Sequence, residues 1–311
     1  MGAGHPECPQ RLGAIADRLI ATGLDTVLDW READPLDAPA LVQALQRAHA
    51  AGYVLEIGEL MAAAADAGQS RAVDPDTSAS PATGRAAEAA LAAALAATDA
   101  VIDGTAANAF CAIRPPGHHA TRDAAMGFCF YNNVAVAARH ALDGRGLQRV
   151  AIIDFDVHHG NGTEDIVAGD ERILMCSFFQ HPLYPYSGAV PKGTNMVNVP
   201  LPPYSGGAAV REAVERQWLP ALDAFAPEMI FISAGFDAHR EDDLGQMGLV
   251  EADYAWLTRT LLAVAERHAR GRIVSCLEGG YHLAALGRSV AAHLRVLAGV
   301  DGPPDGNRTH I

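Results

Sequence analysis

The segment 154–162 reads Asp-Phe-Asp-Val-His-His-Gly-Asn-Gly and directly follows the apolar run Val-Ala-Ile-Ile at 150–153. The apolar run predicts a buried β-strand. Residues two apart in an extended chain point to the same face, so Asp154, Asp156 and His158 are expected to project together. Two carboxylates and an imidazole at a strand end are suitable ligands for a divalent metal, with positions left for water and substrate. A buried ion pair leading into a helix cap is the simpler alternative, but it accounts for only one of the two aspartates.

A second apolar stretch, 108–113, also ends in a polar loop. The sequence Arg-Pro-Pro-Gly follows it, and then come the adjacent histidines His118 and His119. Proline stops helices and strand ladders and glycine permits close approach of the backbone, so these histidines are expected on a stiff loop. A lone histidine here would most often be structural. Two adjacent ones suit general acid and base catalysis, with Asp154 and Asn161 available as orienting partners.

Two further apolar runs, 228–233 and 272–276, end in small residues followed by one functional group each. The first leads to Asp237 and the second leads, through Glu-Gly-Gly, to Tyr281. In an open parallel α/β sheet the site lies beyond the carboxyl ends of the strands, so the four strand ends are expected to meet in one crevice. A tyrosine in a turn is most often a packing or surface residue, and it is this convergence that suggests a catalytic role for Tyr281.

Helix and strand patterns alternate along the chain, which predicts an α/β fold with a mostly parallel sheet covered by helices on both faces. Helices are predicted near 11–23, 39–50, 53–67, 85–103, 131–142, 207–225, 251–269 and 283–298, and strands near 108–113, 149–155, 172–178, 228–233 and 272–277. The segments 68–84 and 181–207 are rich in proline and glycine and are expected to be irregular binding loops. We expect a single domain over residues 1–300 and a loose tail over 301–311.

The composition suits one globular domain of enzyme size, with 311 residues of which 50% are hydrophobic and 19% charged. The five cysteines are odd in number and three lie in or beside apolar strands, which indicates reduced core residues of a cytoplasmic protein. No signal peptide precedes the first motif, and the alanine-rich run 86–102 is too short and too weakly apolar to span a membrane. The net charge of −14 argues against unaided binding of nucleic acid.

Several segments together resemble the zinc-dependent histone deacetylase family, in the broad sense that includes bacterial histone deacetylase-like amidohydrolases and acetylpolyamine amidohydrolases. They follow the family's order along nearly the whole chain: 5–12, 114–120, 127–133, 154–163, 198–201, 233–239 and 278–281. Such a series is far more specific than any one motif. Asn161 stands where class I members carry aspartate, so the chain resembles the class II branch. The resemblance implies an arginase/deacetylase-like fold and a deacetylase catalytic domain.

The resemblance also implies that Asp156, His158 and Asp237 hold one Zn²⁺, with Fe²⁺ as the credible substitute, and leave a position for water. The metal would lower the pKa of that water and polarise the acetamide carbonyl. Tyr281 would donate a hydrogen bond to the tetrahedral oxyanion. The implied reaction is hydrolysis of the amide of an acetylated lysine in a peptide, or of a related N-acyl amine such as an acetylpolyamine or a small metabolite.

The resemblance gives the two histidines different roles. His119, facing Asn161, would be the general base that takes the water proton and then protonates the leaving amine. His118, held by Asp154, would stay more cationic and stabilise negative charge. A carboxylate partner and an amide partner push the pKa values of two imidazoles apart, which fits this division.

A substrate channel is implied in the same way. Gly127 and Phe128 resemble one wall of a narrow apolar channel for the lysine methylenes. The opposite wall is expected from an aromatic residue of a later loop: Phe179, Tyr184 or Tyr186. Core packing explains each of these aromatic residues equally well. Leu244 stands where polyamine-selective relatives place a glutamate and acyl-lysine deacetylases place an apolar residue, so it favours acetyl-lysine.

A second cation site is implied beneath the zinc. The main-chain carbonyls of Asp154, Asp156 and His158, with Ser177 and Phe178, resemble a monovalent cation site for K⁺. Such an ion would offset the clustered carboxylates.

Relatives usually carry a strand ahead of the motif at residues 5–12, and only four residues precede this motif here. Either the edge strand is absent or the start is truncated. An exposed sheet edge, or a partner such as a second copy that covers it, is therefore expected.

Two other functions compete with deacetylation. A dimetal ureohydrolase of the arginase type needs additional bridging aspartates, and Asn161 at a position where a carboxylate could sit argues for one metal. A protein that binds acyl amides without hydrolysing them has no use for an oxyanion donor such as Tyr281.

Overall fold

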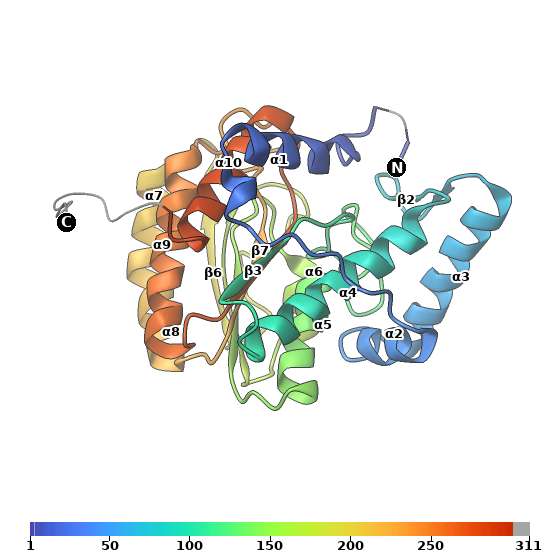
Figure 1. The fold of residues 1–311 in the computed structure, drawn as a ribbon, viewed down its shortest axis with the longest axis horizontal. Helices are drawn as coiled ribbons and strands as arrows, with labels where there is room; N and C mark the ends of the chain where they lie inside the picture. The colour runs from blue at the N-terminus through green and yellow to red at the C-terminus, as the bar shows by residue number, and fades with distance from the viewer. Residues whose placement is uncertain (3, 301–311) are drawn as a thin grey trace.

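One six-stranded parallel sheet forms the centre of the protein in the computed structural model, which describes residues 1–2 and 4–300 (Figure 1). The strands lie in the order β3 (Asn108–Cys111), β8 (Ile273–Leu277), β7 (Ile230–Ala234), β4 (Val150–Asp154), β5 (Ile173–Gln180) and β6 (Met196–Leu201). Every neighbouring pair is parallel. The predicted fold class, a single α/β domain with a parallel sheet, is confirmed.

Side chains alternate along the strands between two hydrophobic cores, one on each face of the sheet. In β4, Val150 and Ile152 lie in one core, and Ala151 and Ile153 lie in the other. The first core is covered by α2 (Ala38–Leu45), α3 (Ala51–Ala67), α4 (Thr83–Ile102), α5 (Asn133–Arg139) and α6 (Asn161–Val167). The second is covered by α1 (Gln10–Ala21), α7 (Gly207–Ala213), α8 (Leu219–Phe225), α9 (Glu251–His268) and α10 (Leu283–Leu297). Figure 1 shows α8 and α9 on one side of the sheet and α4 and α5 on the other.

The expectation that 181–207 is irregular is wrong for Met196–Leu201, which forms strand β6. Pro200 lies within this strand and has no N–H to donate, which is why the sequence argues against a strand here. Because β6 is at the edge of the sheet, it pairs only with β5 and tolerates the proline. The other segment expected to be irregular, 68–84, contains only the short antiparallel pair β1 (Arg71–Ala72) and β2 (Ser78–Ala79).

The predicted helices are present, but two of them are interrupted by wider turns. The helix predicted at 131–142 is α5 followed by the π-helical turn His140–Gly144. The helix predicted at 207–225 consists of α7, the π-helical turn Val214–Trp218, and α8. The short helix α6 is not predicted, because it begins in the Gly-Asn-Gly turn, whose residues favour loops.

The edge of the sheet at β3 is partly open, since Asn108, Ala109 and Phe110 are half-buried. The end of α10 lies against it, where Asn108 Nδ2 donates a hydrogen bond to the Leu297 carbonyl (2.9 Å). Whether a second copy covers this edge stays a prediction, and the predicted tail over 301–311 lies outside the described residues.

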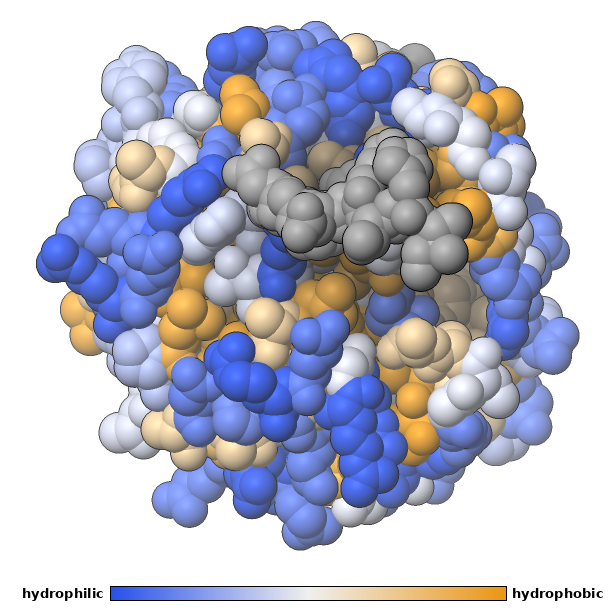
Figure 2. Space-filling model, turned by 60° about the vertical axis from the view of Figure 1, so that its left-hand side comes forward, coloured by the Kyte–Doolittle hydropathy of each residue, from blue (hydrophilic) through white to orange (hydrophobic). Residues whose placement is uncertain are grey.

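Hydrophilic side chains cover most of the face drawn in Figure 2, and hydrophobic ones form small separate areas between them. Such scattered exposed apolar residues are normal for a folded protein. Within the described ranges, none of the helices combines the length and the apolar character that crossing a bilayer requires.

Candidate active site

Four neighbouring strands carry the predicted site residues at their carboxyl ends. The strands β3, β8, β7 and β4 are consecutive in the sheet. The loops after them bear, in that order, the two histidines, the tyrosine, one aspartate, and the Asp-x-Asp-x-His sequence. Parallel strands end at the same edge, so the four loops meet there as the sequence predicts.

Asp156, His158 and Asp237 form the centre of this edge. Their potential ligand atoms all lie within 4.8 Å of one another. The Nδ1 atom of His158 is 3.0 Å from Asp156 Oδ1 and 3.3 Å from Asp237 Oδ2. Asp237 Oδ2 is buried and, among the described residues, makes no contact that satisfies hydrogen-bond geometry. A buried carboxylate oxygen without a donor is costly unless a cation faces it, so these three residues are able to hold a divalent metal.

Glycines surround this cluster because nothing larger fits. A Cβ atom added to Gly279 would lie 1.9 Å from Asp237 Oδ2, and one added to Gly235 would lie 2.0 Å from Asp156 Oδ2. The backbone instead approaches closely and donates hydrogen bonds, from Gly279 N to Asp156 Oδ2 (2.8 Å) and from Val157 N to Asp237 Oδ1 (3.0 Å). The small residues at these strand ends therefore orient the two carboxylates.

The charges in the cluster are coupled. Burial opposes protonation of His158, but the nearby carboxylates of Asp156 and Asp237 outweigh burial and raise the pKa of His158 to about 10. Burial, with the charge of Asp156, raises the pKa of Asp237 to about 6. The two carboxylates thus stabilise positive charge at this place, which is what a bound divalent cation would supply.

The two adjacent histidines lie beside the cluster with different partners, as predicted. His118 Nδ1 is 3.0 Å from Asp154 Oδ2, whereas His119 Nδ1 is 2.8 Å from Asn161 Oδ1. Their ring centroids are 4.0 Å apart. Burial opposes the charge of His118, but the carboxylates of Asp156 and Asp154 outweigh it and raise its pKa well above the usual value. Burial and repulsion from the charged His118 hold the pKa of His119 well below the usual value.

The partner of His119 also fixes its tautomer. The amide oxygen of Asn161 only accepts hydrogen bonds, while its Nδ2 donates toward Met126 Sδ (3.3 Å). The proton of a neutral His119 is therefore on Nδ1, and Nε2 keeps its lone pair. This arrangement allows His119 Nε2 to accept a proton.

Tyr281 stands on a loop whose carbonyls are held by a buried arginine. Arg11 Nε donates to the Gly280 carbonyl (2.7 Å) and Arg11 Nη2 donates to the Glu278 carbonyl (2.5 Å). The guanidinium also lies 4.8 Å from the centre of the Tyr281 ring. Burial raises the pKa of Tyr281 well above its usual value, so its hydroxyl keeps its proton and is able to donate a hydrogen bond.

The structure distinguishes among the aromatic residues predicted for the channel. The ring of Phe128 lies edge to face with Tyr281, at 6.0 Å between centroids. The ring of Tyr184 lies 5.2 Å from that of His119. Phe179 is buried against His159, and Tyr186 is 74% exposed, so neither faces the site as Tyr184 does. Tyr184 is therefore the better candidate for the wall opposite Phe128.

The sequence gives no role to Glu278, although this buried residue joins three strand ends. Its Oε2 accepts hydrogen bonds from Gly117 N (2.6 Å) and His118 N (3.1 Å), and its Oε1 accepts one from Ser233 Oγ (3.1 Å). Burial raises its pKa to about 7. An ionisable residue directly after an apolar strand is the signal that could have identified it.

The residues predicted to hold a monovalent cation are partly neighbours. Asp154 of β4 and Ser177 of β5 are paired in the parallel ladder, and both are buried. Ser177 Oγ donates a hydrogen bond to Asn198 Oδ1 (3.2 Å). Phe178 follows Ser177 and packs against Trp218, with stacked rings 5.6 Å apart. A potassium ion at this place stays a prediction.

Known proteins match this chain along almost its whole length. The histone deacetylase domain family matches residues 5–297. The histone deacetylase-like amidohydrolase of Pseudomonas aeruginosa is 39% identical over 305 residues, covering 96% of this chain and 78% of that protein. The polyamine deacetylase HDAC10 of Homo sapiens is 35% identical over 319 residues, covering 96% of this chain and 46% of that protein. The crystal structure of the HDA15 HD domain matches with a TM-score of 0.85 at 34% identity, covering 96% of this chain and 83% of that chain. The chain therefore belongs to the histone deacetylase family of amidohydrolases.

Proposed function

We propose that this protein is a zinc-dependent deacetylase that hydrolyses the amide of acetyl-lysine or a closely related acyl amine. The observation that carries the proposal is the buried Asp237 Oδ2, which has no hydrogen-bond donor in the described part of the chain and faces His158 next to Asp156. Two carboxylates and one imidazole suit Zn²⁺ with a position left for water, and Fe²⁺ is the alternative for the same ligands. Membership of the histone deacetylase family supports the reaction class.

When bound, the metal supplies a water of lowered pKa and polarises the acetamide carbonyl. The protein moves the protons. His119 Nε2 accepts the proton of the attacking water, because Asn161 holds the ring in the tautomer with a free Nε2 and the low pKa of His119 keeps it neutral. The same nitrogen then returns the proton to the leaving amine.

Two further groups stabilise negative charge as it develops on the substrate. His118 stays cationic because Asp154 and Asp156 stabilise its charge, and it faces the site from the side of His119. The hydroxyl of Tyr281 donates to the oxyanion, since its raised pKa keeps it protonated. Phe128 and Tyr184 line the approach to these groups and suit the methylenes of a lysine side chain.

The direct test is turnover of an acetylated lysine peptide by the purified protein, with its metal content measured in parallel. We expect hydrolysis that is lost on chelation and restored by one equivalent of Zn²⁺ or Fe²⁺. Binding of the peptide without release of acetate would support an acyl-amide binding protein instead. A requirement for two metals per chain would support a dimetal hydrolase.

The partner of His119 makes the pH dependence testable. Asn161→Asp places a carboxylate beside His119, which stabilises the imidazolium and raises its pKa by about one unit or more. Since the base must be neutral, the acidic limb of the kcat/KM profile is expected to move to higher pH by a similar amount. The measurement is kcat/KM against pH for both proteins. An acidic limb at the same pH in both would remove His119 from the role of base.

Leu244 bears on the choice between peptide and polyamine substrates. Three acidic residues surround it, but Asp242 is buried and accepts backbone hydrogen bonds, and Glu241 pairs with Arg288. Only Asp243 is exposed, and it forms no ion pair with another described residue. A single exposed carboxylate attracts a polyamine more weakly than a glutamate at position 244 would. Acetyl-lysine is therefore the favoured substrate.

Leu244→Glu is expected to shift kcat/KM from an acetyl-lysine peptide toward N8-acetylspermidine by roughly tenfold or more, since a charge-assisted contact forms at the channel. Leu244→Gln is the matched control, because it adds the same size and polarity without the charge. The native enzyme should prefer the peptide. If it already hydrolyses the acetylpolyamine far better, the acetyl-lysine assignment is wrong.

A further inference from the structure

A single buried carboxylate joins two loops of the site. Asp242 is 6% exposed. Its Oδ2 accepts hydrogen bonds from the backbone N–H groups of Tyr281 (2.6 Å) and His282 (3.0 Å), and its Oδ1 accepts one from Leu244 N (3.1 Å). It therefore links the loop after β7, which contains Asp237, to the loop after β8 that contains Tyr281.

The loop that bears Tyr281 is anchored before the tyrosine, where Gly279 N donates to Asp156 Oδ2 (2.8 Å), and Asp242 binds the backbone at the tyrosine itself. Gly279 and Gly280 precede the tyrosine, and Gly280 has a φ of 118°, a conformation open mainly to glycine. Arg11 holds the carbonyls of this loop from one side. Asp242 accepts the N–H groups of Tyr281 and His282 from the other side, so it is the carboxylate that binds the backbone of the tyrosine directly.

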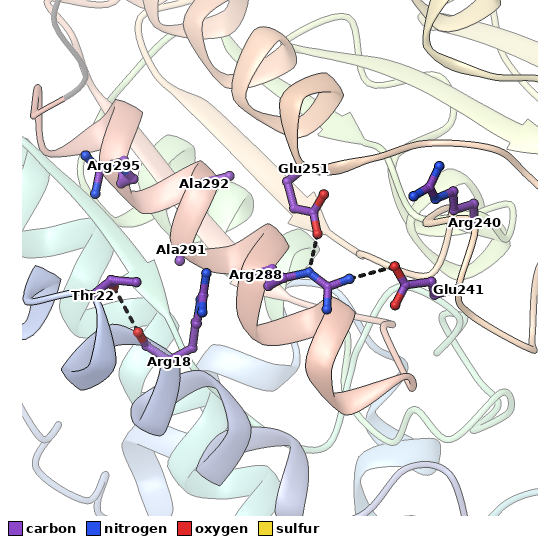
Figure 3. Close-up of a pocket in the computed structure, with 9 residues that line it drawn as sticks. All are labelled: Arg18, Thr22, Arg240, Glu241, Glu251, Arg288, Ala291, Ala292 and Arg295. Carbon is purple, nitrogen blue, oxygen red and sulfur yellow. Dashed lines mark hydrogen bonds and ion pairs between the residues drawn. The ribbon is translucent and has the colours of Figure 1, made fainter.

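The segment that carries Asp242 is also bound on its surface side by α10. Arg288 of α10 donates to Glu241 Oε1 (2.8 Å) and also pairs with Glu251, as Figure 3 shows. These residues line a surface hollow of about 590 Å³ that also includes Arg18 and Arg240 and contains none of the metal-cluster residues. Glu241 is thus directed outward to Arg288, while the adjacent Asp242 is directed inward to Tyr281.

We propose that Asp242 is a positioning residue for Tyr281: its carboxylate fixes the tyrosine relative to the metal cluster and so controls kcat without touching the substrate. The inference rests on the proposed deacetylase function. The hydroxyl of Tyr281 acts only if it reaches the oxyanion. A small displacement of such a donor lowers the reaction rate, because stabilisation of the oxyanion depends on donors that are in position before the reaction begins.

The test compares Asp242→Asn with the native, metal-loaded enzyme. A side-chain amide has one acceptor oxygen and an NH2 group that only donates, so it cannot accept the N–H groups that face both oxygens of Asp242. We expect kcat on the acetyl-lysine peptide to fall about 10- to 100-fold, with KM and metal content changed less than about twofold. Asp253→Asn is the matched control. Asp253 is also a buried aspartate that accepts a backbone hydrogen bond, from Val250 N (3.1 Å), and it should lose stability but keep kcat.

A double substitution distinguishes a positioning role of Asp242 from a general loss of structure. In the Tyr281→Phe background, Asp242→Asn should lower kcat by less than about threefold, because the hydroxyl that it positions is already gone. If Asp242→Asn does not fold, Arg288→Gln replaces it, because it releases the segment from outside and should lower kcat only when Tyr281 is present. Equal losses in both backgrounds, or an unchanged kcat with native Tyr281, would overturn the inference.

These outcomes are distinct from failure of the proposed function. If the native protein hydrolyses no acetylated amine, the deacetylase assignment fails. If the native protein is active and Asp242→Asn is equally active, only the positioning role of Asp242 fails.

Discussion

Asp237→Ala is expected to give a folded protein that no longer retains its divalent metal and whose kcat/KM is at least about 10³-fold lower. Asp237 supplies one of the three ligand side chains found among the described residues, and within the same part of the chain its buried Oδ2 has no hydrogen-bond donor. Removing it takes away both a charge and one corner of the site. The loss of several kcal/mol of transition-state stabilisation corresponds to the expected factor.

Elemental analysis after dialysis, together with peptide turnover, checks this prediction. Asp223→Ala is a suitable control, because Asp223 is a surface residue that pairs with Arg267, and its variant should retain one metal per chain and full activity. Full metal content and activity in Asp237→Ala would contradict the assigned ligands. Two metals per native chain would favour the dimetal alternative.

The sequence predicts the meeting of the site residues because parallel strands leave few alternatives. The runs at β3, β4, β7 and β8 are largely apolar, a polar segment follows each of them, and parallel strands of one sheet end at the same edge. The period of two along 154–158 then places Asp154, Asp156 and His158 on one side of the chain. Both are local signals, and together they are sufficient to predict that these residues belong to one site.

The residues that hold the site together are harder to predict from the sequence, because their hydrogen-bond partners are distant along the chain. Arg11 acts on the carbonyls of Glu278 and Gly280, more than 260 residues away, and nothing near Arg11 indicates this. Asp242 contacts Tyr281 across 39 residues. Such contacts depend on how loops fold back over the sheet, which periodicity and turn composition do not determine.

Strand β6 and the channel wall are two other features that the sequence alone does not predict. Pro200 makes strand β6 hard to predict, because proline lacks an N–H and is tolerated only where no further strand pairs on that side. The order of strands in the sheet cannot be predicted from the local sequence. Tyr184 and Tyr186 are two residues apart in a proline-rich loop, and the same pattern suits either of them. Only the three-dimensional path of the loop brings Tyr184 next to His119.

Tyr281→Phe is expected to lower kcat by roughly 10²- to 10³-fold while KM, metal content and thermal stability stay close to native values. The factor corresponds to about 3–4 kcal/mol, the usual contribution of one oxyanion donor. The phenylalanine ring keeps the contacts that position the side chain, namely the edge-to-face packing with Phe128 and the cation–π contact with Arg11. The substitution therefore removes only the hydroxyl, which acts on the transition state rather than on bound substrate.

Tyr254→Phe is the matched control for this experiment. Tyr254 is fully buried, its ring lies 5.1 Å from that of Phe236 next to the metal cluster, and its hydroxyl has no hydrogen-bond partner among the described residues. Removing that hydroxyl costs no contact, so kcat should change by less than about twofold. Steady-state kinetics on the acetyl-lysine peptide measure both variants. If Tyr281→Phe retained native kcat, Tyr281 would be a packing residue, and the charge on the oxyanion would have to be stabilised by His118 and the metal alone.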